Sequence, residues 1–150
     1  MVLESPEIHV SMNTIHIDEL FHSFRERFSH LLTQKNLTFM TNVEVESVEG
    51  DEFLITRALS NLIVNACHYS DENSTITLTS YRGKDGNAIS VHNWGLVISE
   101  EEKNRIFDRL YRGEFARKTP GSGLGLTIVY QIAQLHKATI RVESSQEQGT

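Results

Sequence analysis

The residues best suited to chemistry form a glycine run, Gly121-Ser122-Gly123-Leu124-Gly125-Leu126, directly before an apolar helical pattern. Glycines at this place let backbone N–H groups approach a phosphate, and the helix N-terminus adds about half a positive charge. A dinucleotide fingerprint would need glycine where Leu126 stands, and a P-loop would end in Gly-Lys-Ser or Gly-Lys-Thr. The run therefore indicates a phosphate site of another type, and a simple loop hinge is the alternative.

Two asparagines upstream, Asn61 and Asn65, give the glycine run a partner. They lie four residues apart on a helix predicted from about Asp51 to Tyr69, so they share one stripe, which His68 and Tyr69 continue. Asparagine inside a helix costs roughly 0.5 kcal/mol relative to alanine, so two on one stripe call for a reason. A solvated pair is the simple interpretation. The functional one is a neutral oxygen ligand for Mg²⁺ that also holds substrate phosphates.

A third pattern ends a predicted strand with Asn93, two residues before Gly95. It places a polar side chain at a strand end, beside a glycine that permits a backbone kink. A capping box that begins at Ser99 then opens a short helix carrying Arg109 and Arg112. Basic residues of this kind supply the local positive charge that a polyanionic nucleotide needs in a chain of net charge −6.

The order of these motifs is informative. An N-x-x-x-N-A helix, a strand ending in N-x-G, an F-x-R-x-Y-R helix and G-x-G-L-G-L before a helix follow one another. This order resembles the ATP-binding catalytic domain of two-component sensor histidine kinases, in the wider family that includes gyrase B, Hsp90 and MutL. The resemblance covers about Ile15 to Thr150, and four ordered motifs at compatible spacings make it specific.

The resemblance implies a site for ATP and Mg²⁺. Asn65 would ligate Mg²⁺, Asn93 would face the adenine amino group, and Arg112 would reach the γ-phosphate. Asn61 and Arg112 would be the catalytic residues, and segment 112–121 would be the ATP lid. The implied nucleotide contacts are Asn61, Asn65, His68, Tyr69, Asn93, Gly95, Arg109, Arg112, Gly121, Ser122, Gly123, Leu124, Gly125 and Leu126.

Some positions depart from the pattern of these kinases. Asn93 stands where most of them carry aspartate, Val97 replaces a second glycine, and His68 replaces a common lysine. In having asparagine at position 93 of this glycine motif, the chain resembles the heavy-metal-responsive branch of sensor kinases. The ATP-hydrolysing clamps of the wider family place glutamate where Asn61 stands, and glutamate can activate water as a base whereas an amide cannot. Transfer of phosphate to a histidine is therefore expected. A hydrolysing clamp and a non-catalytic nucleotide-binding module remain the alternatives.

Composition excludes several classes. The chain has 150 residues, enough for one domain with a real core, and 39% hydrophobic residues. No run of about 18 apolar residues occurs, so this segment is not expected to span a membrane. The net charge of −6 argues against nucleic acid as a partner. Cys67 lies on the apolar side of its helix and is interpreted as a structural core thiol.

The predicted architecture is a two-layer α/β sandwich, with a mixed sheet packed on about three helices, which the resemblance identifies as the Bergerat-type ATP-binding fold. Helices are expected from Asp18 to about Gln34, from Asp51 to Tyr69 and after the glycine run. Strands are expected at Ile15–Ile17, Leu37–Thr41, Ser74–Tyr81, Asn87–His92 and Ala138–Glu143, with a hairpin turn at residues 84–87.

The resemblance also implies what surrounds this domain. Residues 1–150 would form a single catalytic domain, and the phosphoacceptor and sensor domains would lie outside the chain. The implied partners are a histidine-bearing dimerisation domain of the same protein and a response regulator. The domain would be monomeric and cytoplasmic, whereas the parent would be a homodimer in the bacterial inner membrane. The end at Gly149-Thr150, where the family usually adds a strand, suggests a fragment.

Overall fold

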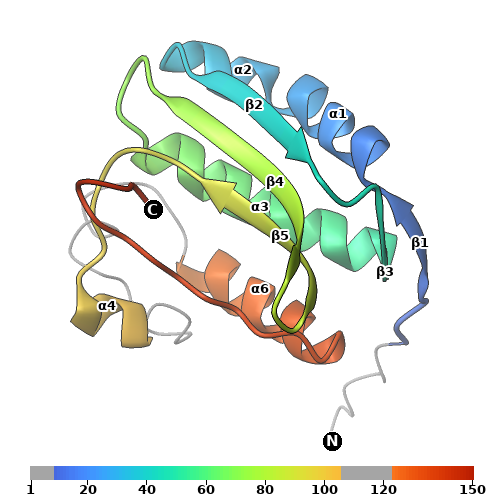
Figure 1. Cartoon of the computed structure of the whole chain (residues 1–150). Helices are drawn as coiled ribbons and strands as arrows, with labels where there is room; N and C mark the ends of the chain where they lie inside the picture. Colours follow the sequence, from blue (N-terminus) through green and yellow to red (C-terminus); the bar gives the residue numbers. More distant parts are fainter. Residues whose placement is uncertain (1–8, 106–122) are drawn as a thin grey trace, which may run out of the picture.

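The computed structural model describes residues 9–105 and 123–150, which form two small sheets and the helices that cover them (Figure 1). The predicted lid and the residues Arg109, Arg112, Gly121 and Ser122 lie outside these ranges. In chain order the elements are β1 (Asn13–His16), α1 (Ile17–Arg27), α2 (Ser29–Gln34), β2 (Thr38–Val43), β3 (Ser47–Gly50), α3 (Glu52–Tyr69), β4 (Thr75–Gly83), β5 (Gly86–His92), α4 (Glu100–Arg105) and α6 (Gly123–Leu135).

The larger sheet is mixed, as predicted. Its strand order is β2-β4-β5, in which β2 pairs parallel with β4 and β4 pairs antiparallel with β5. A parallel pair needs a crossover connection, and here the crossover between β2 and β4 includes β3 and α3. Strand β3 does not join this sheet but pairs antiparallel with β1, so that Asn13 faces Gly50.

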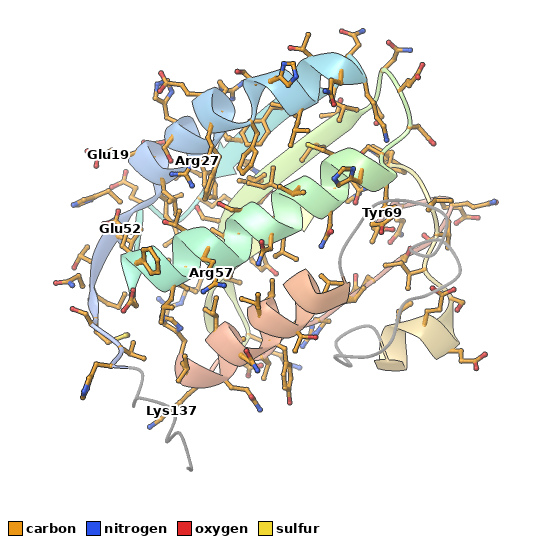
Figure 2. All side chains as sticks on the ribbon, turned by 180° about the vertical axis from the view of Figure 1, so that it is seen from behind. Glu19, Arg27, Glu52, Arg57, Tyr69 and Lys137 are labelled. Atoms are coloured by element: carbon orange, nitrogen blue, oxygen red, sulfur yellow. The ribbon has the colours of Figure 1, made fainter. Side chains whose placement is uncertain are left out.

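Helices cover one face of the larger sheet, which confirms the two-layer sandwich. Seen from behind, α1, α3 and α6 lie side by side across the strands (Figure 2). Alternate residues of β4 show the two faces, because Ile76, Leu78 and Ser80 are fully buried whereas Thr77 and Thr79 are only partly buried. The buried face packs on the helices, and a polar face remains on the other side.

The core lies between the strands and the apolar sides of α1 and α3. Phe24 and Ile63 are fully buried and Phe21 almost so, and each such side chain contributes roughly 1.5–3 kcal/mol by leaving water. Cys67 is buried in the same cluster, as predicted, and this burial raises the pKa of its thiol to about 11. Helix α3 is therefore fixed along its length against the sheet.

The prediction for the first helix was partly wrong. Ile17 begins α1 rather than ending a strand, and its N–H donates to Glu46 O at 2.9 Å. The helical run is also split at Phe28, whose φ of −102° and ψ of 12° end α1 and precede α2. The apolar stripe nevertheless faces inward as predicted, because Phe24 before the break, Phe28 at the break and Leu32 after it are all buried.

The hairpin between β4 and β5 is confirmed, and its loop is tight. Gly83 pairs with Gly86, so Lys84 and Asp85 alone form the turn. Gly86 has a φ of +125°, a conformation that residues with a Cβ rarely adopt, which explains the glycine at this position.

The predicted strand at Ala138–Glu143 is wrong. Within the described residues no ladder pairs with this segment, and the next paired positions are the isolated bridge of Ser145 with Gly149. Apolar alternation alone does not make a strand, because a strand also needs a partner edge that accepts its backbone hydrogen bonds.

In residues 9–105 and 123–150, no helix is both long and apolar enough to cross a bilayer.

Candidate nucleotide-binding site

Helix α3 carries the predicted asparagines and has two apolar sides. One side, which includes Leu59 and Ile63, packs in the main core against the sheet. The other side includes Ala58, which forms a second cluster with Val129 and Ile132 of α6. This second contact fixes α6 beside α3.

The side of α3 that faces α6 changes from apolar to amide along the helix. Asn61 follows Leu54 by seven residues and Asn65 follows Ala58 by seven, and two helical turns return a side chain to nearly the same face. Leu54 and Ala58 belong to the cluster with α6, so Asn61 and Asn65 continue that stripe toward Tyr69. Both asparagines are partly buried, which excludes the interpretation of a fully solvated pair.

A polar joint fixes the relative direction of the two helices. The backbone N–H of Asp51, the N-cap of α3, donates to Nε2 of His136 just beyond the end of α6, at 3.0 Å. Nδ1 of His136 in turn donates to Ile132 O at 2.8 Å, so the ring carries its proton on Nδ1. The end of α6 thus lies at the start of α3, and its glycine-containing start lies toward Tyr69 (Figures 1 and 2).

The Asp51 side chain completes this joint. Its Oδ1 accepts from Leu54 N at 3.0 Å and its Oδ2 accepts from Ser11 N at 2.9 Å. The backbone N–H groups of Ser11 and Leu54 hold the pKa of the Asp51 carboxyl below its usual value, because they stabilise the charged form. The predicted N-cap is confirmed, and its carboxyl oxygens are satisfied within the protein.

Asn65 differs from Asp51 and His136, whose polar atoms are paired within the protein. Its Nδ2 is buried and has no hydrogen-bond partner, and Glu102 Oε2 is the other buried side-chain atom in this state among the described residues. A buried polar atom left unpaired costs roughly 1–3 kcal/mol, so such an atom needs an explanation. A half-turn of the amide exchanges its oxygen and nitrogen, so the same position can present an acceptor oxygen. The position suits a ligand that supplies the missing polar partner.

The amide of Asn65 fits a Mg²⁺ ion by its chemistry. Mg²⁺ prefers hard oxygen ligands and usually takes several from water and substrate phosphates. In the described ranges no three His, Cys, Asp or Glu side chains gather where they could hold a metal. A magnesium ion held by these residues would therefore depend on the Asn65 oxygen together with nucleotide phosphates and water.

A second part of the site forms where α3 ends. Ser70 forms an isolated bridge with Gly95, Asp71 N donates to Trp94 O at 2.8 Å, and Leu96 N donates to Tyr69 O at 3.2 Å. A Cβ built on Gly95 would lie 1.9 Å from Tyr69 O, so no other residue fits there without a backbone shift. Gly95 thus brings the end of β5 into contact with the end of α3.

Asn93 lies at this corner and is buried, with 7% of its surface exposed. Its backbone is held by Thr150 in both directions, as Asn93 N donates to Thr150 O at 2.8 Å and Thr150 N donates to Asn93 O at 2.9 Å. The neighbouring Trp94 is partly exposed and packs edge-on against His92, with ring centroids 4.9 Å apart. On the side of β5, the corner is therefore held by these two hydrogen bonds and this ring contact.

The described surface includes a hollow beside this corner and one beside α1. The hollow beside the corner is lined by Asp71, Trp94, Gly95, Leu96, Val97 and the turn at residues 145–149. The other lies between α1 and β2, where Asp18, His22 and Arg25 are among its lining residues. The second hollow contains none of the predicted site residues, and we assign it no role.

The structure brings together most of the predicted site residues that it describes. Asn61, Asn65, His68 and Tyr69 lie on the second half of α3, and Asn93 and Gly95 lie at the adjoining corner. Gly123 begins α6, with Leu124, Gly125 and Leu126 in its first turns. Of the predicted capping box the N-cap half is confirmed, because Glu102 N donates to Ser99 Oγ at 3.1 Å.

Sequence reasoning missed three residues whose hydrogen bonds hold the two ends of α3. These are Lys35 and Ser70 at the end of α3 and His136 at the joint between α3 and α6. A lysine and a serine next to turn residues give no recognisable signal in a sequence, because their importance depends on which backbone carbonyls the fold brings near them. The same holds for His136, whose ring bonds to Asp51, 85 residues away along the chain.

Comparison with known proteins agrees with this geometry. Residues 50–150 match the family model described as histidine kinase-, DNA gyrase B- and HSP90-like ATPase. Because this match covers well over half of the chain, the chain belongs to that ATP-binding family.

The relatives are sensor kinases. The chain is 41% identical over 105 residues to the sensor-like histidine kinase SenX3 of Mycobacterium tuberculosis. The aligned residues make up 69% of this chain and 26% of SenX3. It is 34% identical over 128 residues to the sensor histidine kinase HprS of Escherichia coli, covering 85% of the chain and 28% of HprS. The chain thus spans about a quarter of the length of these relatives.

A solved structure of similar extent is the catalytic domain of histidine kinase ThkA. It superposes with a TM-score of 0.72 at 30% identity, covering 83% of this chain and 80% of that one. The chain therefore has the fold of a histidine kinase ATP-binding catalytic domain. Membership of the heavy-metal-responsive branch stays a prediction.

Proposed function

We propose that this domain binds Mg²⁺-ATP and transfers the γ-phosphoryl group to a histidine on a separate dimerisation domain of the same protein. A response-regulator aspartate would receive the group next. The observation that carries the proposal is Nδ2 of Asn65, a buried atom without a hydrogen-bond partner, on the stripe of α3 that faces α6. Membership of the ATP-binding family supports the nucleotide, and the sensor kinases among the relatives support the acceptor.

In this proposal the nucleotide lies along the second half of α3. Adenine occupies the corner, where Asn93 accepts a hydrogen from the adenine amino group and Tyr69 offers an aromatic face. The phosphates lie toward the start of α6, where the helix N-terminus favours negative charge. The backbone N–H groups of Gly121 to Gly125 would hold them. Residues 112–121 form the lid, and Arg112 reaches the γ-phosphate.

Asn65 would hold Mg²⁺ through its side-chain oxygen. When bound, Mg²⁺ supplies positive charge that offsets the negative charge on the phosphates during transfer. The acceptor histidine nitrogen attacks the γ-phosphorus as the bond to the bridging oxygen breaks, and ADP leaves. Asn61 carries no carboxylate in this site, so it cannot act as a base for water, which favours transfer over hydrolysis.

The whole protein is proposed to be a homodimeric sensor kinase of the bacterial inner membrane, with residues 1–150 as its one catalytic domain. The catalytic domain by itself is proposed to be monomeric.

A labelling experiment tests the transfer. The domain is incubated with γ-labelled Mg²⁺-ATP, alone and with the parent's dimerisation domain added in trans. We expect label on the dimerisation domain only when both are present, and little free phosphate from the catalytic domain alone. A dimerisation domain with its acceptor histidine replaced by glutamine is the matched control.

Two results would count against the proposal. Stoichiometric label on the isolated domain would show an acceptor within this chain. Rapid release of phosphate without the dimerisation domain would favour the ATP-hydrolysing clamp, whereas ATP binding without any transfer would favour a regulatory module.

A further inference from the structure

Lys35 forms a polar contact with the end of α3. It follows α2 directly, is partly buried, and its Nζ donates to His68 O at 2.6 Å and to Ser70 O at 3.0 Å. The last carbonyls of a helix have no donor within the helix, and a lysine ammonium near a helix C-terminus both satisfies them and favours the dipole. Lys35 therefore acts as a cap supplied from a different helix.

The two carbonyls that Lys35 binds lie on either side of Tyr69, and one of them belongs to Ser70, which helps to hold the corner of the site. Between the two carbonyls bound by Lys35, Tyr69 O accepts from Leu96 N, and Ser70 pairs with Gly95. The end of α3 is thus held by Lys35 on one side and by the segment after β5 on the other. Gly95 lies so close to the backbone of Tyr69 and Ser70 that a shift of either residue would also move Gly95.

The backbone of Lys35 is itself fixed. Lys35 O accepts from Asn73 N at 2.9 Å, and Asn36 Nδ2 donates to Asn73 Oδ1 at 2.8 Å. Asn36 and Asn73 have φ values of +50° and +64°, a region that asparagine tolerates better than most residues. The loop after α2 is therefore joined to the loop after α3, and this joint sets where the Lys35 ammonium can reach.

We propose that Lys35 is a positioning residue for the base end of the nucleotide site. It contacts two backbone carbonyls of α3 and thereby keeps His68 and Tyr69 aligned with Asn93 across the corner. The inference rests on the proposed placement of adenine at this corner. It assigns to Lys35 an effect on nucleotide affinity that does not pass through Mg²⁺, since Lys35 acts at the end of α3 and Asn65 one turn earlier.

Lys35→Met tests the inference, with Arg25→Met as the matched control. Arg25 is also a basic residue that donates to a backbone carbonyl, Phe39 O at 2.8 Å, but it lies on α1 away from the corner. ATP affinity is measured by calorimetry with Mg²⁺ and with EDTA, next to a thermal melt. We expect Lys35→Met to weaken ATP binding about tenfold in both conditions, since two bonds from a charged donor are lost. Arg25→Met should lower the melting temperature only.

Two further readouts separate positioning from general stability. Lys35→Arg keeps a cationic donor and should restore most of the ATP affinity. Hydrogen exchange of the Asp71 and Leu96 amides, which bond across the corner, should accelerate in Lys35→Met and not in Arg25→Met. The fluorescence of Trp94, the chain's one tryptophan, reports on the same corner.

Unchanged ATP affinity in folded Lys35→Met, or equal weakening in Arg25→Met, would overturn the inference. If Lys35→Met does not fold, Lys35→Gln, which keeps a shorter donor, takes its place under the same criteria. A wild-type domain that fails to bind ATP contradicts the proposed function and this inference with it. Normal wild-type binding combined with normal binding by the variant contradicts the inference alone.

Discussion

The two halves of the contact between α3 and α6 differ in what fills them. In the first half of α3, Leu54 and Ala58 pack in an apolar cluster with α6, and the Asp51–His136 joint satisfies its own polar groups. In the second half the same stripe presents Asn61 and Asn65, and the Asn65 amide keeps a buried atom without a partner. The first half thus has the apolar packing and the paired polar groups that stabilise two packed helices. In the second half, asparagines take the place of apolar side chains.

This difference separates residues that hold the fold from residues that bind a ligand. Apolar side chains in the second half would have stabilised the domain, and an unpaired amide does not. Its presence is therefore best explained by a ligand that completes it. The comparison also predicts that the two halves respond differently to mutation: the first in stability, the second in nucleotide binding.

The largest expected effect comes from Gly95→Ala. The new methyl would lie 1.9 Å from Tyr69 O, and backbone cannot move aside as a flexible side chain can. We expect a loss of about 3 kcal/mol, the upper end for overpacking, and strong loss of ATP binding. Thermal melts and calorimetry measure both. Gly83→Ala in the hairpin, whose methyl would lie 3.3 Å from Gly86 O, is the milder control. Equal behaviour of the two variants would refute the role of Gly95 at the corner.

Asp51→Ala disrupts the first half of the contact between α3 and α6, whose polar groups are paired within the protein. Loss of an N-cap costs about 1–2 kcal/mol, and we expect ATP affinity to change less than twofold because the cap lies at the far end of α3. The pKa of Asp51 is lowered from its ordinary 3.8, so its contribution to stability is present above about that pH and is lost as pH falls through the folded-state pKa. Chemical denaturation at neutral and acid pH should show the wild-type advantage shrinking below about pH 3.8. A variant that loses ATP binding as strongly as stability would contradict the comparison.

Asn93→Asp tests the corner where the end of β5 meets the end of α3. An aspartate accepts the adenine amino hydrogen through a charge-assisted bond, about twice as strong as a neutral one. An asparagine amide can also turn a donor toward the carbonyl of GTP, so the wild type should discriminate poorly. We expect ATP binding to tighten about tenfold, roughly 1.4 kcal/mol, and the preference for ATP over GTP to widen. Competition binding of both nucleotides to both proteins measures the ratio. A ratio that is unchanged or narrower would mean that Asn93 does not read adenine.

The smallest effect concerns Cys67, on the side of α3 that faces the sheet. Burial raises the pKa of its thiol from 9.0 to about 11, so the thiol stays protonated at neutral pH and should react very slowly with iodoacetamide. The unfolded chain ionises first as pH rises, so stability should decline from about pH 9 toward pH 11. Mass spectrometry of alkylated protein and melts in this pH range provide the measurements, with Cys67→Ala as the reference. Fast alkylation of the folded protein at neutral pH would be inconsistent with this burial.

Much of the fold could be predicted because periodicity and caps are local. The 51–69 helix, its Asp51 cap and the β4–β5 hairpin follow from apolar spacing and from one glycine. The break at Phe28 and the missing strand at 138–143 could not be predicted in this way. They depend on which partner the chain meets in space, and a sequence pattern does not contain that information.

The candidate site also contains residues that a sequence pattern reveals and residues that only the fold reveals. The Asn61–Asn65 stripe and Asn93 with Gly95 could be recognised as residue types at a spacing, and their meeting at the end of α3 follows from the fold. The caps that position them could not be found, because Lys35 acts on backbone carbonyls 33 and 35 residues away along the chain. The lid and the arginines lie outside the described residues, so their roles stay predictions.

The most direct test of the account is whether Asn65 makes nucleotide binding depend on Mg²⁺. Calorimetry with ATP, with Mg²⁺ and with EDTA, is run on the wild type, on Asn65→Ala and on Ser60→Ala, a control on the same helix whose hydroxyl accepts from Arg27 on α1. The account predicts Mg²⁺-dependent affinity in the wild type and in Ser60→Ala, and its loss in Asn65→Ala with an unchanged thermal melt. Unchanged Mg²⁺-ATP affinity in Asn65→Ala would contradict it.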